Sequence, residues 1–336
     1  MIKSSEALAP LLEVDSLSVD YISKGVPLRA IEQVSFSLAA GEAVALVGES
    51  GSGKTTTAMS IAGLLPPTAK VSGGDVSYRG KRLPIDDDEA MRPHRWSEIS
   101  VVFQGAMNAL NPVHRVLKQI AEPCILKLGM SQSEATARAR ELLELVGIPA
   151  DRGSAFPHEL SGGMRQRVMI AMALACRPSI IVGDEPTTAL DVITQAQILK
   201  LLGKLRSELN LGLILITHDL SVVAESCDRA MIMYAGRIVE DGLVDDIFNE
   251  PKHPYTKLLI ESIPNPAKGK QILRPITGDP PTLHNRPSGC AFRSRCPSAI
   301  QVCATEVPRL DLSVQGRVAC HLHRYSTQVQ RVGSDA

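Results

Sequence analysis

Aromatic residues are scarce in this chain, with Phe, Trp and Tyr making up 3% and a single Trp present. Because proteins that bind single-stranded nucleic acid stack bases on aromatic side chains, this scarcity argues against such a platform. A charge excess is also missing, since 36 Lys and Arg balance 36 Asp and Glu. Without a basic block, the chain lacks the electrostatic signature of a DNA-binding protein. We therefore expect no nucleic-acid partner.

Long apolar runs are missing as well. The longest, around residues 168–176, falls well short of the ~20 apolar residues that a membrane-spanning helix needs. No secretory signal is recognisable. The sequence therefore predicts a soluble chain, so that any transport would occur through other, membrane-embedded subunits. A length of 336 residues with 44% hydrophobic content allows one large domain with a real core plus something smaller.

The first motif that carries chemistry is a glycine-rich loop at residues 48–55, which fits G-x-x-x-x-G-K-[ST]. An apolar run at 42–47 predicts a buried strand before the loop, and residues 56–65 predict a helix after it. In such a loop, backbone N–H groups and the helix N-terminus surround phosphate oxygens. We expect Lys54 to reach the β- and γ-phosphates and Thr55 to bind Mg²⁺. The expected nucleotide contacts here are Gly48, Ser50, Gly51, Ser52, Gly53, Lys54, Thr55 and Thr56.

A second motif pairs two carboxylates at the end of an apolar run, residues 180–185. Its β-branched residues predict a central strand. Asp184 is expected to hold Mg²⁺, and Glu185 to act as general base on the attacking water. The plainer interpretation is a strand that ends in a solvated acidic pair.

Two further polar residues end predicted strands. Gln104 follows the apolar run 99–103 and is expected to contact both Mg²⁺ and the attacking water. His218 follows the apolar run 213–216 and is expected to contact the γ-phosphate, although a lone His in this place often only packs or lies at the surface.

The most specific motif is Leu-Ser-Gly-Gly-Met-Arg-Gln at 160–166, followed by a predicted helix. It builds a second anion-binding helix N-terminus, although the chain already has a phosphate loop. With this motif the chain resembles the ATP-binding subunits of ABC transporters over about residues 11–250. The resemblance implies a head-to-tail dimer that sandwiches two ATPs, each held by one chain and closed by the signature segment of the other.

That resemblance assigns further roles. Ser161, Gly162 and Gly163 would contact the ATP of the second chain, and Tyr21 would stack on adenine, with plain packing as the alternative for the tyrosine. Asp191 is expected to make a contact across the dimer interface, with a simple helix cap as its alternative.

The expected fold class is α/β, a P-loop NTPase with a RecA-like core. Residues 11–47 predict strands of an antiparallel edge sheet, about 106–176 a helical subdomain, and 177–245 the alternation that closes a parallel sheet. A capping box at 131–134 predicts a helix that ends at Gly147. The apolar face of that helix would consist of Ala139, Leu142, Leu143 and Val146.

Composition changes after about residue 250. Residues 251–336 hold 10 of the 22 prolines, and twelve Lys and Arg against five Asp and Glu give this segment a net charge of +7. Proline at this density predicts loops rather than long helices, without a core of their own. Four of the seven cysteines, which could staple such a segment, lie here: Cys290, Cys296, Cys303 and Cys320.

Disulfides between these cysteines are not expected, because such an ATPase works in the reducing cytoplasm. Four thiolates suit zinc or an iron–sulfur cluster, His321 and His323 could substitute as ligands, and unlinked thiols are the alternative. A second resemblance bears on the choice. The segment His-Pro-Tyr-Thr at 253–256 and the residues around the acidic pair resemble the ATP-binding subunits of dipeptide and oligopeptide importers, whose C-terminal cysteines are associated with a [4Fe-4S] cluster.

This narrower resemblance implies an ATPase that powers a membrane importer of dipeptides or oligopeptides from the cytoplasmic face of the inner membrane. Its partners would be a second, different ATPase subunit, two permease subunits and, indirectly, an extracytoplasmic binding protein. Related subunits serve nickel, glutathione or oligosaccharides, which remain alternatives. A soluble ABC ATPase of translation or DNA repair, an exporter ATPase and a regulatory subunit with an inactive site are disfavoured by the single cassette, the C-terminal extension and the complete motifs.

The C-terminal extension is expected to be mainly structural. Arg293 and Arg295, between the first two cysteines, would offset the negative charge of a cluster. Replacing a cysteine would then loosen the extension and weaken subunit assembly, while leaving ATP binding largely intact.

Overall fold

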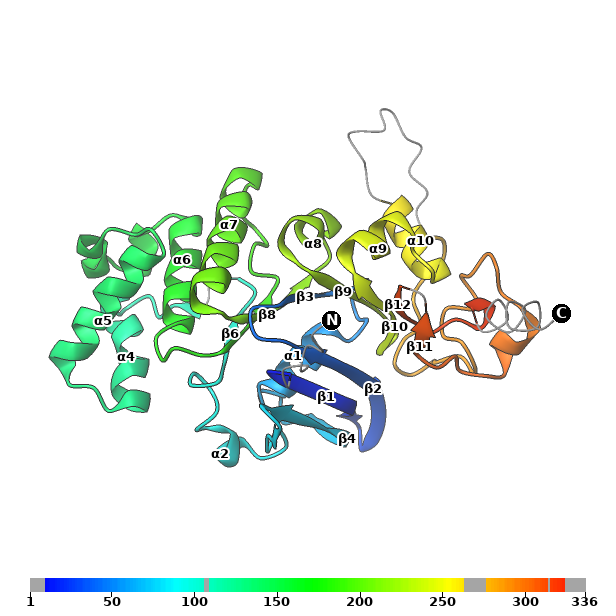
Figure 1. The fold of residues 1–336 in the computed structure, drawn as a ribbon. Coiled ribbons are helices and arrows are strands. Elements are labelled where there is room, and N and C mark those ends of the chain that lie inside the picture. Colours follow the sequence, from blue (N-terminus) through cyan, green and yellow to red (C-terminus); the bar gives the residue numbers. More distant parts are fainter. Residues whose placement is uncertain (1–9, 106–108, 263–275, 314, 324–336) are drawn as a thin grey trace, which may run out of the picture.

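The structure, a computed structural model, describes residues 10–105, 109–262, 276–313 and 315–323. Two sheets form its framework, with helices gathered around the larger one (Figure 1). The strands are β1 Leu12–Ser23, β2 Val26–Leu38, β3 Ala43–Val47, β4 Ala69–Tyr78, β5 Lys81–Arg82, β6 Ile99–Val102, β7 Ile180–Asp184, β8 Gly212–Thr217, β9 Arg229–Tyr234, β10 Arg237–Leu243, β11 Asp311–Ser313 and β12 Gly316–Val318.

The helices alternate with these strands through much of the chain. They are α1 Lys54–Ile61, α2 Asp88–Met91, α4 Val116–Leu128, α5 Gln132–Leu145, α6 Gly162–Ala173, α7 Val192–Leu209, α8 Leu220–Ser226, α9 Val244–Asn249 and α10 Pro254–Glu261, with short 3-10 turns η1 Ala150–Ser154, η2 Pro157–Glu159 and η4 Gln301–Ala304. None of the helices within the described ranges has the length and apolar character to cross a membrane.

The larger sheet has eight strands in the order β11-β12-β10-β9-β3-β8-β7-β6. Strands β9, β3, β8, β7 and β6 run parallel, and every residue of β3, β7 and β8 is buried, as expected for parallel strands covered on both faces. Because parallel strands end at the same edge, the loops after β3, β8, β7 and β6 lie next to one another. Ligands of open parallel sheets bind at this carboxyl edge.

The smaller sheet is antiparallel, with the order β2-β1-β4-β5, and α1 packs against both β2 and the parallel strands. The predicted α/β class with an antiparallel edge sheet is confirmed. The prediction for residues 11–47 was too broad, however, because β3 belongs to the parallel sheet, while β4 and β5 complete the edge sheet from sequence that carried no clear strand signal. Register with β1 decides their place: Val76 lies opposite Val14.

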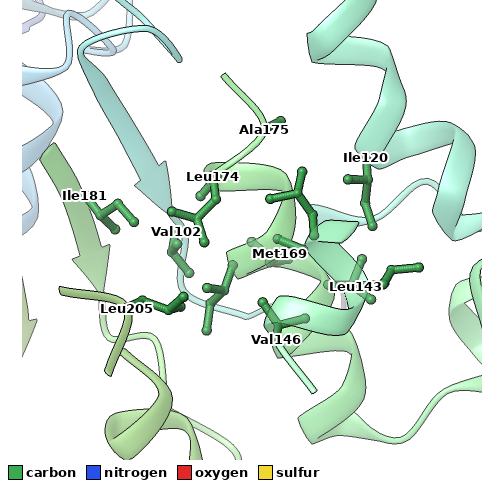
Figure 2. Close-up of a cluster of buried hydrophobic side chains, with 14 of the residues drawn as sticks. Val102, Ile120, Leu143, Val146, Met169, Leu174, Ala175, Ile181 and Leu205 are labelled. Carbon is green, nitrogen blue, oxygen red and sulfur yellow. The ribbon is translucent and has the colours of Figure 1, made fainter. Parts of the chain in front are cut away.

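The helical part of the chain contains α4, α5 and α6. The predicted capping box is present, since Ser131 and Glu134 bond each other's backbone N–H groups, and the four predicted apolar positions of α5 and its end are fully buried. Figure 2 shows how this face packs: Ile120, Leu143 and Met169 from the helices meet Val102 and Ile181 from the sheet. The contact anchors the helical part on β6 and β7. Residues 106–108, where this part was predicted to begin, lie outside the described ranges.

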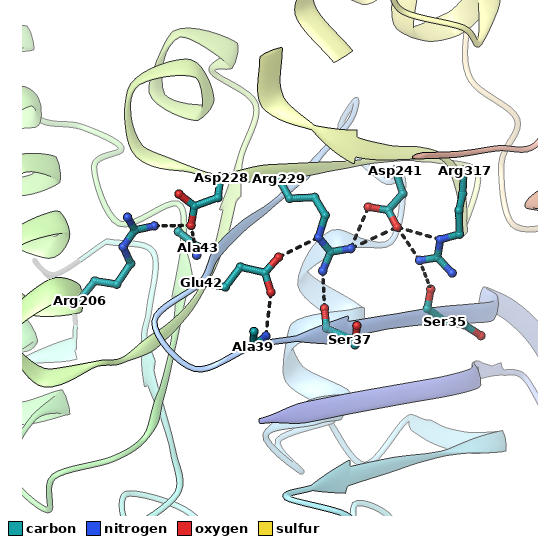
Figure 3. A network of polar contacts seen from close by, with 10 residues as sticks. All are labelled: Ser35, Ser37, Ala39, Glu42, Ala43, Arg206, Asp228, Arg229, Asp241 and Arg317. Atoms are coloured by element: carbon teal, nitrogen blue, oxygen red, sulfur yellow. Dashed lines mark hydrogen bonds and ion pairs between the residues drawn. The ribbon is translucent and has the colours of Figure 1, made fainter. Parts of the chain in front are cut away.

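The C-terminal segment does not stand apart from the larger sheet. Its strand β12 pairs with β10, and Phe292 is buried in a cluster with Tyr234 and Tyr255. Figure 3 shows a polar network in which Arg317 of β12 and Arg229 of β9 both bond Asp241. The segment therefore shares the core of the main sheet, which the proline and charge content did not reveal.

Candidate functional site

The glycine-rich loop at 48–53 turns tightly at the carboxyl end of β3. A side chain at Gly48 would place its Cβ 2.2 Å from the Met233 carbonyl oxygen, so only glycine fits there. Gly53, the residue before α1, has a φ of 104°, in the left-handed region that glycine favours. These two positions bring the loop close to β9 and open the N-terminus of α1 toward the loop.

Lys54, the first residue of α1, is buried, with its ammonium group folded back onto the loop. Its Nζ donates hydrogen bonds to the carbonyl oxygens of Gly48 at 2.8 Å and Glu49 at 3.0 Å. Burial lowers the pKa of Lys54, and the negative charges of Glu185, Asp184 and Glu49 oppose that effect. Two backbone carbonyl oxygens thus fix the position of the Lys54 ammonium group inside the loop.

Next to the lysine, two oxygen ligands meet across the sheet edge. Thr55 Oγ1 donates to Asp184 Oδ1 at 3.2 Å, and Asp184 is buried at the end of β7. Burial raises the pKa of Asp184, the Thr55 hydrogen bond opposes the rise, and the charge of Glu185 adds to it. A buried carboxylate beside a hydroxyl is a hard-oxygen pair of the kind that magnesium prefers.

Glu185 is held in an uncommon backbone conformation, with a φ of 45°. Its Oε1 lies 2.9 Å from His218 Nδ1, and its Oε2 accepts hydrogen bonds from Gln104 Nε2 at 2.7 Å and Thr188 Oγ1 at 2.9 Å. Burial alone would raise the pKa of Glu185, but the hydrogen bonds from His218 and Thr188 and the charges of His218 and Lys54 lower it overall. The side chain is therefore an oriented, ionised carboxylate. Sequence reasoning missed Thr188, because no motif marks it.

A cavity of about 730 Å³ joins these groups to the phosphate loop. This volume lies in the range typical of small-molecule sites. Tyr21, which is half-buried in β1, lines one side of the cavity. The wall also includes Ala30 of β2 and, from the C-terminal segment, Leu283, and the sequence predicted neither of these two. The wall comprises Tyr21, Ala30, Ser50, Gly51, Gly53, Lys54, Thr55, Thr56, Gln104, Glu185, His218 and Leu283.

The signature segment lies elsewhere. Ser161, Gly162 and Gly163 do not belong to the cavity wall as far as the described residues define it. Ser161 caps α6 by accepting a hydrogen bond from the Met164 N–H at 3.3 Å. A Cβ on Gly163 would come within 2.5 Å of Thr194 on α7, so the start of α6 packs tightly against the start of α7.

Asp191, predicted to contact a partner chain, is the N-cap of α7 within this chain. It accepts the Thr194 N–H at 2.9 Å and the Thr194 hydroxyl at 2.6 Å. The simple cap, given as the alternative, is thus present, and it places Asp191 on the same exposed face as the signature.

The four cysteines of the C-terminal segment gather in one region. Burial raises the pKa of Cys290 to about 11, and the nearby thiols of Cys303, Cys320 and Cys296 add to the rise. The Cys290 N–H also donates to the Cys303 carbonyl oxygen at 2.9 Å. Among the described residues, however, no group of three or more His, Cys, Asp or Glu side chains is arranged to hold a metal ion. His321 and His323 instead donate from Nε2 to backbone carbonyl oxygens, those of Glu306 and Lys252.

The two arginines assigned to the cysteine site have other partners. Arg293 bonds the carbonyl oxygens of Ser288 and Ala304, and Arg295 forms a two-pronged ion pair with Glu49 in the phosphate loop. Because a guanidinium fork matches a carboxylate in shape and charge, the pair with Glu49 is the stronger interaction. The predicted electrostatic role of these arginines toward the cysteines stays a prediction.

Comparison with known proteins agrees with this geometry. Residues 31–188 match the family described as ABC transporter, and residues 239–303 match the one described as oligopeptide/dipeptide transporter, C-terminal region. The dipeptide transport ATP-binding protein DppD of Haemophilus influenzae is 44% identical over 313 residues, which are 93% of this chain and 95% of that protein. The oligopeptide transport ATP-binding protein OppD of Salmonella typhimurium is 44% identical over 92% of this chain and 93% of its own length.

A solved structure gives the same picture for the cassette. It is a dimeric ATP-binding cassette in a post-hydrolysis state bound to ADP and Pi, with a TM-score of 0.62 and 31% identity over 69% of this chain and 98% of its own. The similarity to solved cassettes leaves the C-terminal segment uncovered.

Proposed function

The chain belongs to the ABC transporter ATP-binding subunits that serve dipeptide and oligopeptide importers, and from this premise we propose how its residues bind and hydrolyse ATP. It is an ATPase coupled to transport. The observation that carries the mechanism is the convergence of the phosphate loop, Gln104, Glu185 and His218 on one cavity. ATP hydrolysis by the chain assembled with its permeases, stimulated by a peptide-loaded binding protein, tests the function; hydrolysis indifferent to peptide would contradict it.

Binding of the nucleotide begins with the phosphate loop. Its N–H groups and the N-terminus of α1 receive the phosphates, and Lys54 transfers its hydrogen bonds from the Gly48 and Glu49 carbonyls to the β- and γ-phosphates. Thr55 and Asp184, with Gln104, would hold Mg²⁺, which supplies charge neutralisation on the phosphate oxygens. Mg²⁺ commonly keeps several waters and uses one or two protein carboxylates, which this pair can provide.

Hydrolysis depends on Glu185. A carboxylate offers about four lone-pair sites, and in this chain His218 uses one on Oε1 while Gln104 and Thr188 use those on Oε2. The remaining site on Oε1 can accept a hydrogen bond from the attacking water and then its proton. His218 keeps the carboxylate ionised and oriented, and contacts the γ-phosphate with its other ring nitrogen.

The signature segment serves a second chain. Ser161, Gly162 and Gly163 lie away from the cavity, so the anion site at the start of α6 is free to close on ATP held by a partner ATPase subunit. Asp191, at the start of α7, would lie at the same interface. The partner is a different ATPase chain, and the pair docks on two permease subunits at the cytoplasmic face of the inner membrane.

The ring of Tyr21 stacks on the adenine base in the proposed site. Tyr21→Ala is expected to weaken ATP and ADP binding alike by about 1–3 kcal/mol, the range for stacking of a base on an aromatic ring. Tyr21→Phe keeps the ring and should bind nucleotide normally. Tyr78→Ala is the matched control, because this half-buried tyrosine of the same sheet bonds Ser179 and lies outside the cavity wall. Equal affinities for wild type and Tyr21→Ala, measured by titration calorimetry, would return Tyr21 to ordinary packing.

The four-cysteine region is proposed to hold a [4Fe-4S] cluster. Backbone N–H groups of Phe292, Ser298 and Leu322 act to lower the pKa values of Cys290, Cys296 and Cys320, but burial outweighs them and raises all three, so these thiols would give up their protons on binding iron. Four thiolates each bind a separate iron of a cluster, so they do not converge on one point as around a single ion. The donor set thus fits the cluster, whose chemistry here would be structural.

Iron analysis tests this proposal. Anaerobically purified chain is expected to contain about four irons and four sulfides with a visible charge-transfer band, as a cluster ligated by four cysteines requires. Cys320→Ser should lose the band and weaken assembly with the partner subunits, whereas Cys227→Ser, outside the segment, should keep both. If the analysis finds one zinc per chain, the four cysteines hold a single ion and not a cluster. If it finds no metal and four freely titrating thiols, both the cluster and the single-ion site are excluded.

A further inference from the structure

Glu49, the second residue of the phosphate loop, is held at three separate points. Its backbone N–H donates to the Tyr255 hydroxyl at 3.0 Å, and its carbonyl oxygen accepts from Lys54 at 3.0 Å. Its carboxylate accepts two hydrogen bonds from Arg295, at 2.6 Å and 2.9 Å. Two of these three partners, Tyr255 and Arg295, lie in the C-terminal segment. The C-terminal segment, which lies outside the cassette, thus holds the phosphate loop at two of these three points.

Arg295 is itself fixed before it reaches Glu49. Only 4% of its side chain is exposed, and it lies over the Tyr234 ring with one N–H 3.2 Å from the Tyr234 hydroxyl. Its Nε donates to the Thr277 carbonyl oxygen at 3.1 Å. A guanidinium so constrained presents its fork to Glu49 in one geometry, and loss of the arginine leaves the half-buried Glu49 carboxylate without its counter-charge.

The charge of Glu49 gives this contact a consequence for nucleotide binding. A carboxylate within the loop that receives a polyphosphate repels it, and the repulsion is strong where water is scarce. Arg295 cancels that charge. The Glu49 carbonyl also directs Lys54, so a rotation of Glu49 would turn the lysine away from its place in the loop.

We propose that Arg295 is a positioning residue for ATP binding, which holds Glu49 and the phosphate loop in their binding geometry and cancels the Glu49 charge. The inference rests on the proposed nucleotide site. The sequence alone predicted that loosening the C-terminal segment would leave ATP binding largely intact. Because the segment contacts the phosphate loop directly, we now expect its loosening to weaken ATP binding as well as subunit assembly.

The experiment measures ATP and ADP affinity of the full-length chain by titration calorimetry. Arg295→Met is expected to weaken ATP binding about tenfold, equivalent to about 1.4 kcal/mol, and ADP binding less, because ATP carries more negative charge. Adding Glu49→Gln to Arg295→Met removes the uncompensated charge and should restore ATP affinity to within about threefold of wild type. A role in packing alone would give no such rescue and no difference between ATP and ADP.

Two further variants separate the possible outcomes. Arg317→Met removes another arginine–carboxylate contact of the C-terminal segment, with Asp241, which does not line the cavity, and should leave ATP affinity unchanged. Lys54→Ala should abolish ATP binding; if it does not, the proposed nucleotide site fails. If Lys54→Ala abolishes binding while Arg295→Met binds ATP like wild type, or if the double variant is as weak as Arg295→Met, the role of Arg295 is overturned and the nucleotide site stands.

Discussion

Glu185→Gln is expected to abolish steady-state ATP hydrolysis while ATP still binds. The amide is almost the same size, and its one acceptor oxygen can keep the hydrogen bonds from Gln104 and Thr188 while its NH₂ group faces His218; Lys54 and the phosphate loop are untouched. It cannot take a proton from the attacking water, however, and a general base contributes about 10²–10⁴-fold to a rate. Since ATP remains uncleaved, the closed dimer should accumulate.

The measurement is ATP turnover of the chain assembled with its partners, together with the stoichiometry of trapped ATP. Glu134→Gln is a suitable control, because it converts a carboxylate in the capping box of α5, away from the cavity. Turnover of Glu185→Gln close to that of wild type would show that another group accepts the proton.

Ser161→Arg is expected to cripple hydrolysis at the site owned by the partner while leaving nucleotide affinity of the isolated chain nearly unchanged. The phosphate loop is elsewhere in the chain, whereas a bulky side chain at the start of α6 would block the anion site that we propose closes on the partner's ATP. Loss of one preorganised donor group at a reacting centre costs about 10²–10³-fold in rate, and a comparable loss is expected here.

Loss of the helix cap is the competing explanation for such a result. Ser161 is the N-cap of α6, and removing a cap costs about 1 kcal/mol of stability. Ser131→Arg removes the equivalent cap of α5 without touching the signature, so it measures that cost alone. A drop in ATP affinity of the isolated Ser161→Arg chain would point to a role within the same chain and against closure on a partner.

Local sequence was sufficient where a function depends on consecutive residues. The loop at 48–55 follows from a run of consecutive residues that fits G-x-x-x-x-G-K-[ST], and the capping box at 131–134 starts α5 because its two bonds lie within one turn. Apolar runs that end in Gln104, Asp184 or His218 predicted strands whose ends meet at one edge, which the strand order then realised. The family was therefore predictable from the sequence alone, and the roles of single residues toward the nucleotide stay predictions.

Contacts between distant residues could not be read in the same way. Leu283 in the cavity wall and the edge strands β4 and β5 carry no sequence signal of their own. Proline content predicted a C-terminal segment without a core of its own, but it could not reveal that Phe292 is buried among residues of the main sheet. Burial of a single side chain depends on which surfaces meet, and composition does not record this.

The chain order by itself thus determined the cassette class, the phosphate loop, the acidic pair and the signature, because each is a run of neighbouring residues whose geometry is local. Only the tertiary structure decided that Arg295 pairs with Glu49, 246 positions earlier in the chain, rather than with the cysteines beside it. The physical reason is competition: an arginine binds the carboxylate that the fold presents in fork geometry, whatever lies next to it in the sequence.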